Sequence, residues 1–143
     1  MFKLSGEDKA NVKAVWDHVK GHEDAFGHEA LGRMFTGIEQ THTYFPDKDL
    51  NEGSFALHSH GKKVMGALSN AVAHIDDLEA TLVKLSDKHA HDLMVDPAEF
   101  PRLAEDILVV LGFHLPAKFT YAVQCSIDKF LHVTMRLCIS KYR

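Results

Sequence analysis

The spacing of apolar residues is the feature that most constrains how this chain can fold. Near the N-terminus the apolar residues are Val12, Val15, Trp16 and Val19. This i, i+3, i+4, i+7 pattern places side chains on one face of an α-helix. The same spacing recurs along nearly the whole chain, and no segment shows the sustained alternation typical of a β-strand. The sequence therefore predicts an all-α protein.

Capping residues and prolines divide the pattern into helices. Ser5, followed three residues later by Asp8, forms a capping-box pattern that starts the first helix. Pro46 indicates a corner over 43–46, Asp96–Pro97 indicates a helix start, and Pro116 indicates a helix end. Further helical stretches are predicted from Phe26 to Phe35, after Ser54 to Ile75, from Leu78 to His89, from Asp96 towards Pro116, and from Val123 to Leu137.

Length and composition narrow the class of protein. A chain of 143 residues is expected to form one domain over residues 1–143, with a core that needs no disulfide or metal to fold. With 45% hydrophobic and 25% charged residues, disorder and fibrous repeats are excluded. The net charge of −4 gives no electrostatic reason to bind nucleic acid or an anionic membrane.

The cysteines and the N-terminus indicate the compartment. Cys125 and Cys138 lie on one predicted helix, roughly 20 Å apart along its axis, so they cannot form a disulfide. The residues after Met1 contain no apolar run of signal-peptide length, and the longest apolar stretch is far too short to cross a bilayer. We therefore expect a soluble protein of the reducing cytosol.

Two of the 11 histidines lie on otherwise apolar helix faces. Residues two apart on a helix point in nearly opposite directions, so each of the doublets His58–His60 and His89–His91 can place only one histidine on a given face. His60 shares a face with Val64 and Leu68, and His89 continues the face of Leu82 and Leu85. The other nine histidines show no such pattern, and surface exposure or proton buffering is the better interpretation for most of them.

Three interpretations of His60 and His89 are open from the residues alone. A histidine on an apolar face is more often a buried structural residue than a ligand. A structural zinc site needs four ligands, usually with cysteine, and neither cysteine lies near these histidines. An apolar pocket with one or two imidazoles fits a flat apolar cofactor better, and haem is the best candidate.

A resemblance to a known family covers Leu4 to Arg143 without gaps. The segments that carry it are Leu4–Ser5, Asn11–Ala14, Glu29–Leu31, Arg33–Phe35, Thr43–Pro46, His60–Val64, Asn70–His74, Leu85–Asp87, His89–His91, Val95–Pro97, Asp128–Leu131 and Ser140–Arg143. In these segments the chain resembles the globin family, and within it the alpha-type chains of vertebrate haemoglobin. The 29 residues from His60 to His89 are similar to the family's distal-to-proximal spacing. The resemblance implies a globin fold of seven to eight helices around a haem pocket, without the short helix before the distal-histidine helix.

The resemblance also implies the roles of the site residues. His89 would be the proximal ligand of haem iron, and His60 the distal histidine that donates a hydrogen bond to bound O₂, with Val64 beside it. Haem b would be the cofactor. The protein would be a carrier of O₂ rather than an enzyme, and it would also bind CO. The haem-contacting residues would be Tyr44, Phe45, Lys63, Leu68, Leu85, Leu93, Val95, Phe100 and Leu103.

For assembly, the resemblance implies an α₂β₂ tetramer with beta-type chains in the cytoplasm of red blood cells. Tyr44, Asp96, Tyr142 and Arg143 are similar to residues at subunit contacts. Glu105 and Asp106 depart from the family, which has histidine and cysteine there, near the tighter of the two αβ contacts. Two alternatives remain at this point: a monomeric or homo-oligomeric storage globin, which the alpha-like C-terminus disfavours, and a haem enzyme, which the lack of an arginine near His60 disfavours.

Overall fold

The computed structural model describes residues 3–37, 55–82 and 100–139 of the chain. The elements are α1 (Gly6–Val19), α2 (Glu23–Gly37), α3 (Phe55–Ala73), the 3₁₀ turn η2 (Ile75–Asp77), α5 (Phe100–His114) and α6 (Tyr121–Ile139). Residues 78–82 are also helical, and the described parts of the chain contain no strand. The predicted all-α class is confirmed.

The helix start predicted at Ser5 and the helix end predicted before Pro116 are confirmed, whereas α2 and α6 begin two or three residues earlier than predicted and α3 ends at Ala73 rather than Ile75. The Oγ of Ser5 accepts a hydrogen bond from the backbone N–H of Asp8 at 3.0 Å, and the Asp8 carboxylate accepts one from the Ser5 N–H at 3.0 Å. This is the reciprocal capping box, and it starts α1. Helix α3 begins directly after Ser54, and α5 ends two residues before Pro116. The predicted corner over 43–46 and the helix start at Asp96–Pro97 lie outside the described residues.

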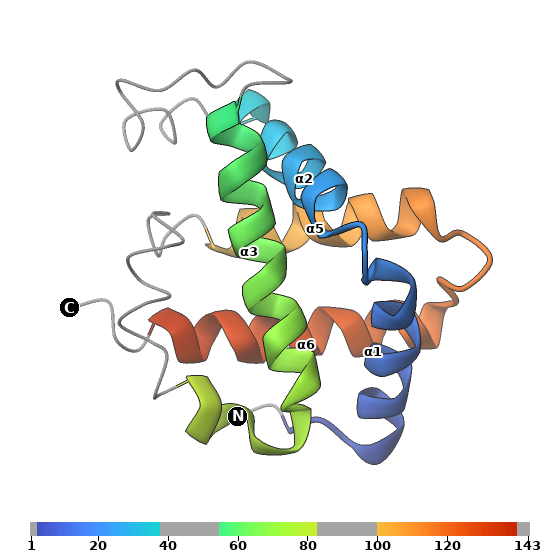
Figure 1. The fold of residues 1–143 in the computed structure, drawn as a ribbon. Coiled ribbons are helices and arrows are strands. Elements are labelled where there is room, and N and C mark those ends of the chain that lie inside the picture. The colour runs from blue at the N-terminus through green and yellow to red at the C-terminus, as the bar shows by residue number, and fades with distance from the viewer. Residues whose placement is uncertain (1–2, 38–54, 83–99, 140–143) are drawn as a thin grey trace.

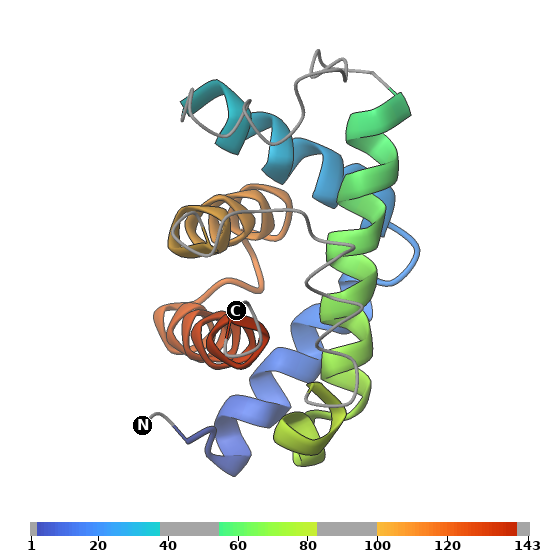
Figure 2. The same cartoon turned by 90° about the vertical axis from the view of Figure 1, so that its left-hand side faces the viewer.

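The helices pack across one another around one core. Helix α3 packs against α2 and α1, α5 packs against α2 and α6, and α6 packs against α1. In Figures 1 and 2, α5 and α6 lie side by side and run in opposite directions, with α3 crossing them on one side. The first helix therefore meets the last one, and the segment that carries His60 is held by α2.

A pair of glycines lets α2 and α3 touch through their backbones. A Cβ atom built on Gly27 would overlap the carbonyl group of Gly61 and lie 2.9 Å from its Cα. Real Cβ atoms essentially never come so close to backbone atoms, so both positions exclude a side chain. Because Gly61 directly follows His60, this crossing fixes where His60 lies relative to α2.

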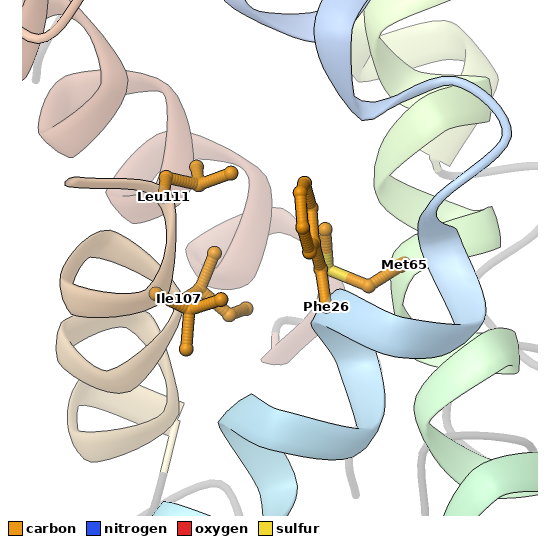
Figure 3. A pocket seen from close by; sticks show the side chains of 5 residues that line it. Phe26, Met65, Ile107 and Leu111 are labelled. Atoms are coloured by element: carbon orange, nitrogen blue, oxygen red, sulfur yellow. The ribbon is translucent and has the colours of Figure 1, made fainter. Parts of the chain in front are cut away.

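Apolar side chains from three helices close the core next to this crossing. Phe26 of α2 and Met65 of α3 face Ile107 and Leu111 of α5 (Figure 3). Together with Val110 they line a gap that has no room for a water molecule. The junction of α2, α3 and α5 is therefore packed tightly enough to hold the buried face of α3 in one position.

A short chain of hydrogen bonds links the first three helices. The indole Nε1 of Trp16 donates to Ser69 Oγ at 3.1 Å, and Ser69 Oγ donates to the Glu23 carboxylate at 3.3 Å. The backbone N–H of Gly21, a residue with φ of 88°, donates to the same carboxylate at 2.8 Å. The buried indole N–H thus has an acceptor, and the turn between α1 and α2 is fixed to α3.

Asp8 joins the first helix to the last. Its buried carboxylate accepts hydrogen bonds from the backbone N–H of Ser5, from Ser126 Oγ at 2.8 Å and from Lys129 Nζ at 3.3 Å. These bonds, the Ser5 N–H first and the Ser126 hydroxyl second, outweigh desolvation and lower the pKa of Asp8 to about 2. Because the folded pKa lies below the unfolded value, this stabilisation is complete above pH 4 and is lost as the pH falls towards 2.

We expect Asp8→Asn to lower the free energy of unfolding by about 1–2 kcal/mol at pH 7. The difference from the unmodified protein should shrink between pH 4 and pH 2, where the native carboxylate becomes protonated. Urea unfolding at a series of pH values measures both effects. Asp76→Asn is the control, because Asp76 is exposed and its ion pair with Lys9, at 3.0 Å, lies at the surface, where such pairs add little. If Asp8→Asn and Asp76→Asn lost the same free energy of unfolding at neutral pH, the Asp8 hydrogen bonds would not have the stabilising role assigned to them.

Candidate functional site

His60 lies on the buried face of α3, as the sequence predicts. Its side chain is 8% exposed, and Val64 and Leu68, one and two turns further along the helix, are 3% and 4% exposed. The close approach of Gly27 and Gly61 anchors the helix beside His60, and the packing at Met65 anchors the next turn. The sequence thus places an imidazole inside an apolar wall and holds it there from two sides.

Two residues of α5 extend this wall. Phe100 and Leu103 are each 1% exposed and belong to the same continuous cluster of buried side chains as Val64 and Leu68. Lys63, on the same turn as His60 and Val64, is exposed. The structure therefore brings four of the predicted apolar contacts into one cluster and leaves the predicted cation at the surface. The remaining predicted site residues lie outside the described residues; they are Tyr44, Phe45, Leu85, His89, Leu93, Val95, Asp96, Tyr142 and Arg143.

The chemistry of these side chains fits a haem group. A porphyrin is flat and largely apolar, so it needs aliphatic and aromatic walls, one or two imidazoles at the iron, and a cation for its carboxylates. His60, the apolar residues of α3 and α5, and the exposed Lys63 provide the described part of such a set. Across residues 3–37, 55–82 and 100–139, no three His, Cys, Asp or Glu side chains converge in a way that could hold a metal ion.

The other described histidines differ from His60 in burial. His18, His22, His74, His114 and His132 are exposed, and His28 is partly buried. His114, at the end of α5, forms a 3.1 Å contact through Nε2 with the Glu29 carboxylate of α2 and stacks on Phe26 with ring centroids 4.9 Å apart. The predicted surface position is thus confirmed for five histidines. Proton buffering by them stays a prediction.

The acidic pair that departs from the family has two different environments. Glu105 is exposed, whereas Asp106 is buried and accepts a hydrogen bond from Arg102 Nε at 3.1 Å. Burial raises the pKa of the Asp106 carboxyl, and the neighbouring guanidiniums of Arg102 and Arg33 oppose that rise. The aspartate is therefore accommodated inside the chain by an arginine one turn earlier on the same helix.

Gly27 and Gly61, which set the position of His60, are not among the residues predicted from the sequence to form the site. Each glycine does stand inside a helical pattern in the sequence, and this is a usable signal. A glycine there lowers helix stability by about 1 kcal/mol relative to alanine, so its presence usually indicates that a side chain would not fit at that position. Their pairing across two helices has no sign in the sequence, since it depends on where α2 and α3 cross.

The all-helical fold and the imidazole set into a buried apolar wall fit a haem-binding protein, and comparison with known proteins identifies the class. The family profile described as Globin matches residues 28–136, which is more than half of the chain. The chain belongs to the globin family.

Within the family, the similarity is to alpha subunits of haemoglobin over nearly the whole chain. Haemoglobin subunit alpha of Taricha granulosa is 70% identical over 142 residues, covering 99% of this chain and 100% of that protein. Haemoglobin subunit alpha-1 is 67% identical in Triturus cristatus and 64% identical in Pleurodeles waltl, each with the same coverage. The predicted resemblance is confirmed. None of the described helices is long and apolar enough to span a membrane.

Proposed function

We propose that this globin carries oxygen as the alpha-type subunit of a tetrameric haemoglobin, with haem b as its cofactor. Its partners are beta-type globin chains in an α₂β₂ assembly, and it works in the cytoplasm of red blood cells as a carrier rather than an enzyme. The observation that supports this most strongly is the buried imidazole of His60 in an apolar wall, in a chain 70% identical to a haemoglobin alpha subunit over its full length. Residues 1–143 form a single globin domain.

Haem supplies the iron that binds O₂ reversibly, and the chain supplies its ligand and its surroundings. With haem bound, His89 would hold the iron through its imidazole, and a hydrogen bond from the other ring nitrogen to the Leu85 carbonyl or the Ser86 hydroxyl would fix the tautomer and orient the ring. Tyr44, Phe45, Leu85, Leu93 and Val95 complete the contacts around the haem that Leu68, Phe100 and Leu103 begin. Lys63 meets a haem carboxylate at the surface.

His60 acts on the gas ligand. With haem present, its ring N–H would donate a hydrogen bond to bound O₂, which carries partial negative charge, whereas the less polarised CO would gain less from such a bond. Val64, one turn away on the same buried face, crowds the ligand beside His60. The surrounding apolar side chains keep water out, which limits oxidation of the iron. Affinity for O₂ is thus set by one polar group in an otherwise apolar wall.

Subunit contacts control that affinity. Tyr142 and Arg143 at the C-terminus, together with Asp96 and Tyr44, form contacts that change when subunits rotate between the low-affinity and high-affinity states. Asp106, although it stands where the family has a cysteine, remains compatible with assembly because Arg102 pairs with it inside the chain.

The visible absorption spectrum of the purified protein, oxygenated and deoxygenated, tests the proposal. We expect a haem spectrum that changes reversibly between the two states. Elution size with and without a beta-type chain, together with the Hill coefficient of the mixture, tests the assembly. A Hill coefficient of one in the full assembly would contradict cooperative transport and would favour a storage globin.

We expect His60→Ala to raise the O₂ dissociation rate by roughly 10- to 100-fold, because a charge-assisted hydrogen bond of about 1.5–3 kcal/mol is lost. The rate of oxidation to the ferric state should also rise. Stopped-flow displacement of O₂ by CO measures the first effect, and loss of the oxygenated spectrum over time measures the second. His74→Ala, at an exposed histidine just beyond the end of α3, serves as the control and should leave both rates unchanged. An unaltered O₂ dissociation rate in His60→Ala would refute the distal role.

A further inference from the structure

Helix α5 carries large apolar side chains on a face that the described parts of the chain leave open. Four exposed residues recur every four positions along the helix, and we call them the outer face: Pro101, Glu105, Val109 and Phe113. Val109 is 48% exposed and Phe113 is 70% exposed. Single exposed apolar residues are ordinary, but apolar neighbours one turn apart join into a larger surface, and such surfaces mark contacts with another protein. The outer face is therefore suited to a protein partner.

Glu105 is the charged residue of the outer face, and no described side chain neutralises it. Within residues 3–37, 55–82 and 100–139, its carboxylate forms neither an ion pair nor a hydrogen bond. Arg102, one turn earlier, donates from Nε to the neighbouring Asp106 at 3.1 Å. Arg33 of α2 also acts on the Asp106 carboxylate. Both arginines thus interact with Asp106, and the described residues leave Glu105 as an exposed negative charge without a countercharge.

A partner that covers Val109 also takes Glu105 out of water, because the two side chains lie one helical turn apart, at about 6 Å. Removing a carboxylate from water without a countercharge is costly, whereas a cation placed against it forms a charge-assisted hydrogen bond. The outer face therefore favours a partner surface that combines apolar side chains with a lysine or arginine. It disfavours a partner with a neutral or acidic residue at that place.

We propose that Glu105 determines which beta-type chain this subunit pairs with, by requiring a lysine or arginine opposite it when the outer face is covered. This inference rests on the proposed assembly with beta-type chains. A second copy of this chain does not meet the requirement, because its own outer face offers another Glu105 and no cation. The occupant of the outer face is therefore a beta-type chain with a basic side chain at the contact.

The affinity between haem-loaded chains tests this inference. The dissociation constant for pairing with the beta-type chain of the same animal is measured at low and at high sodium chloride concentration. We expect Glu105→Gln to weaken pairing at low salt by roughly 10- to 100-fold, because the partner's cation is then covered without its countercharge. Glu105→Lys should weaken pairing further, since two cations then face each other. The affinity of Glu105→Gln should also depend less on salt than that of the unmodified chain, which a purely structural role would not produce.

Two further variants separate the charge from the surface around it. Glu79→Gln is the matched control, because Glu79 is an exposed glutamate on the helical segment 78–82; it should leave the affinity and its salt dependence unchanged. Val109→Ser should weaken pairing by roughly 10-fold, because it removes apolar area from the outer face. Urea unfolding of each haem-loaded variant alone should match that of the unmodified chain, since the altered side chains are exposed.

The possible outcomes decide between the alternatives. If Val109→Ser weakened pairing but Glu105→Gln left it equal or made it tighter, the partner would have no cation opposite Glu105, and the inference would be overturned. Unchanged pairing in both variants would show that the beta-type chain binds elsewhere. Self-association of this chain that is lost in Val109→Ser would assign the outer face to a second copy and so also overturn the inference. If the unmodified chain paired with no beta-type chain, the proposed assembly itself would be refuted.

Discussion

Replacing His89 with glycine is expected to remove the iron ligand and to abolish stable haem binding. In the proposed site the imidazole is the only bond between chain and iron, and the buried side chains of Val64, Leu68, Phe100 and Leu103 would hold the ring by dispersion and burial. Loss of a hydrogen-bond partner of a metal ligand already costs roughly 10- to 100-fold in affinity, so loss of the ligand itself should exceed that. The visible spectrum of His89→Gly, recorded after removal of free haem, measures the effect.

The matched control is His91→Gly, two residues further along, where the helical pattern places the side chain on another face. His91→Gly should keep the haem spectrum. Free imidazole added to His89→Gly should restore part of the ligation, because it replaces the missing ring in the space that the glycine leaves. A normal spectrum in His89→Gly without imidazole would show that another residue binds the iron.

Replacing Gly27 with alanine is expected to destabilise the fold by about 3 kcal/mol or more. The added Cβ would overlap the carbonyl group of Gly61, and a backbone carbonyl inside a helix cannot move aside without shifting the helix. Because Gly61 directly follows His60, the shift should also displace His60. Thermal and urea unfolding of the haem-loaded chain measures the loss of stability, and the O₂ dissociation rate reports on His60.

Gly66→Ala provides the matched control on α3. A Cβ at Gly66 meets nothing within 4 Å, and alanine is the better helix former by roughly 0.5–1 kcal/mol. This variant should therefore be as stable as the unmodified protein or more stable. If Gly27→Ala unfolded at the same urea concentration as Gly66→Ala, the close approach of α2 and α3 would not matter for stability.

Local rules account for what could be predicted from the sequence. The capping box at Ser5 and Asp8 and the helix end before Pro116 depend on neighbouring residues only, and both are present in the structure. The burial of His60 followed from helical spacing, because a face that carries Val64 and Leu68 must turn inwards.

The features that escaped the sequence analysis are contacts between distant segments. The Trp16–Ser69–Glu23 hydrogen bonds join residues of three helices, and the overlap at Gly27 depends on the crossing of two of them. Periodicity shows which face of a helix is buried but not which helix it meets.

The link between the two ends of the chain has a consequence for biosynthesis. Asp8 and Ser126 are 118 residues apart, whereas Trp16 and Ser69 are 53 apart. At roughly 5–20 residues per second, about 6 to 24 seconds pass between translation of Asp8 and of Ser126. Once α3 has been made, the apolar side of α1 has α3 as a packing partner but still lacks α6. A nascent alpha-type chain therefore exposes part of its first helix until translation is almost finished, and that surface is where a chaperone has the longest time to act.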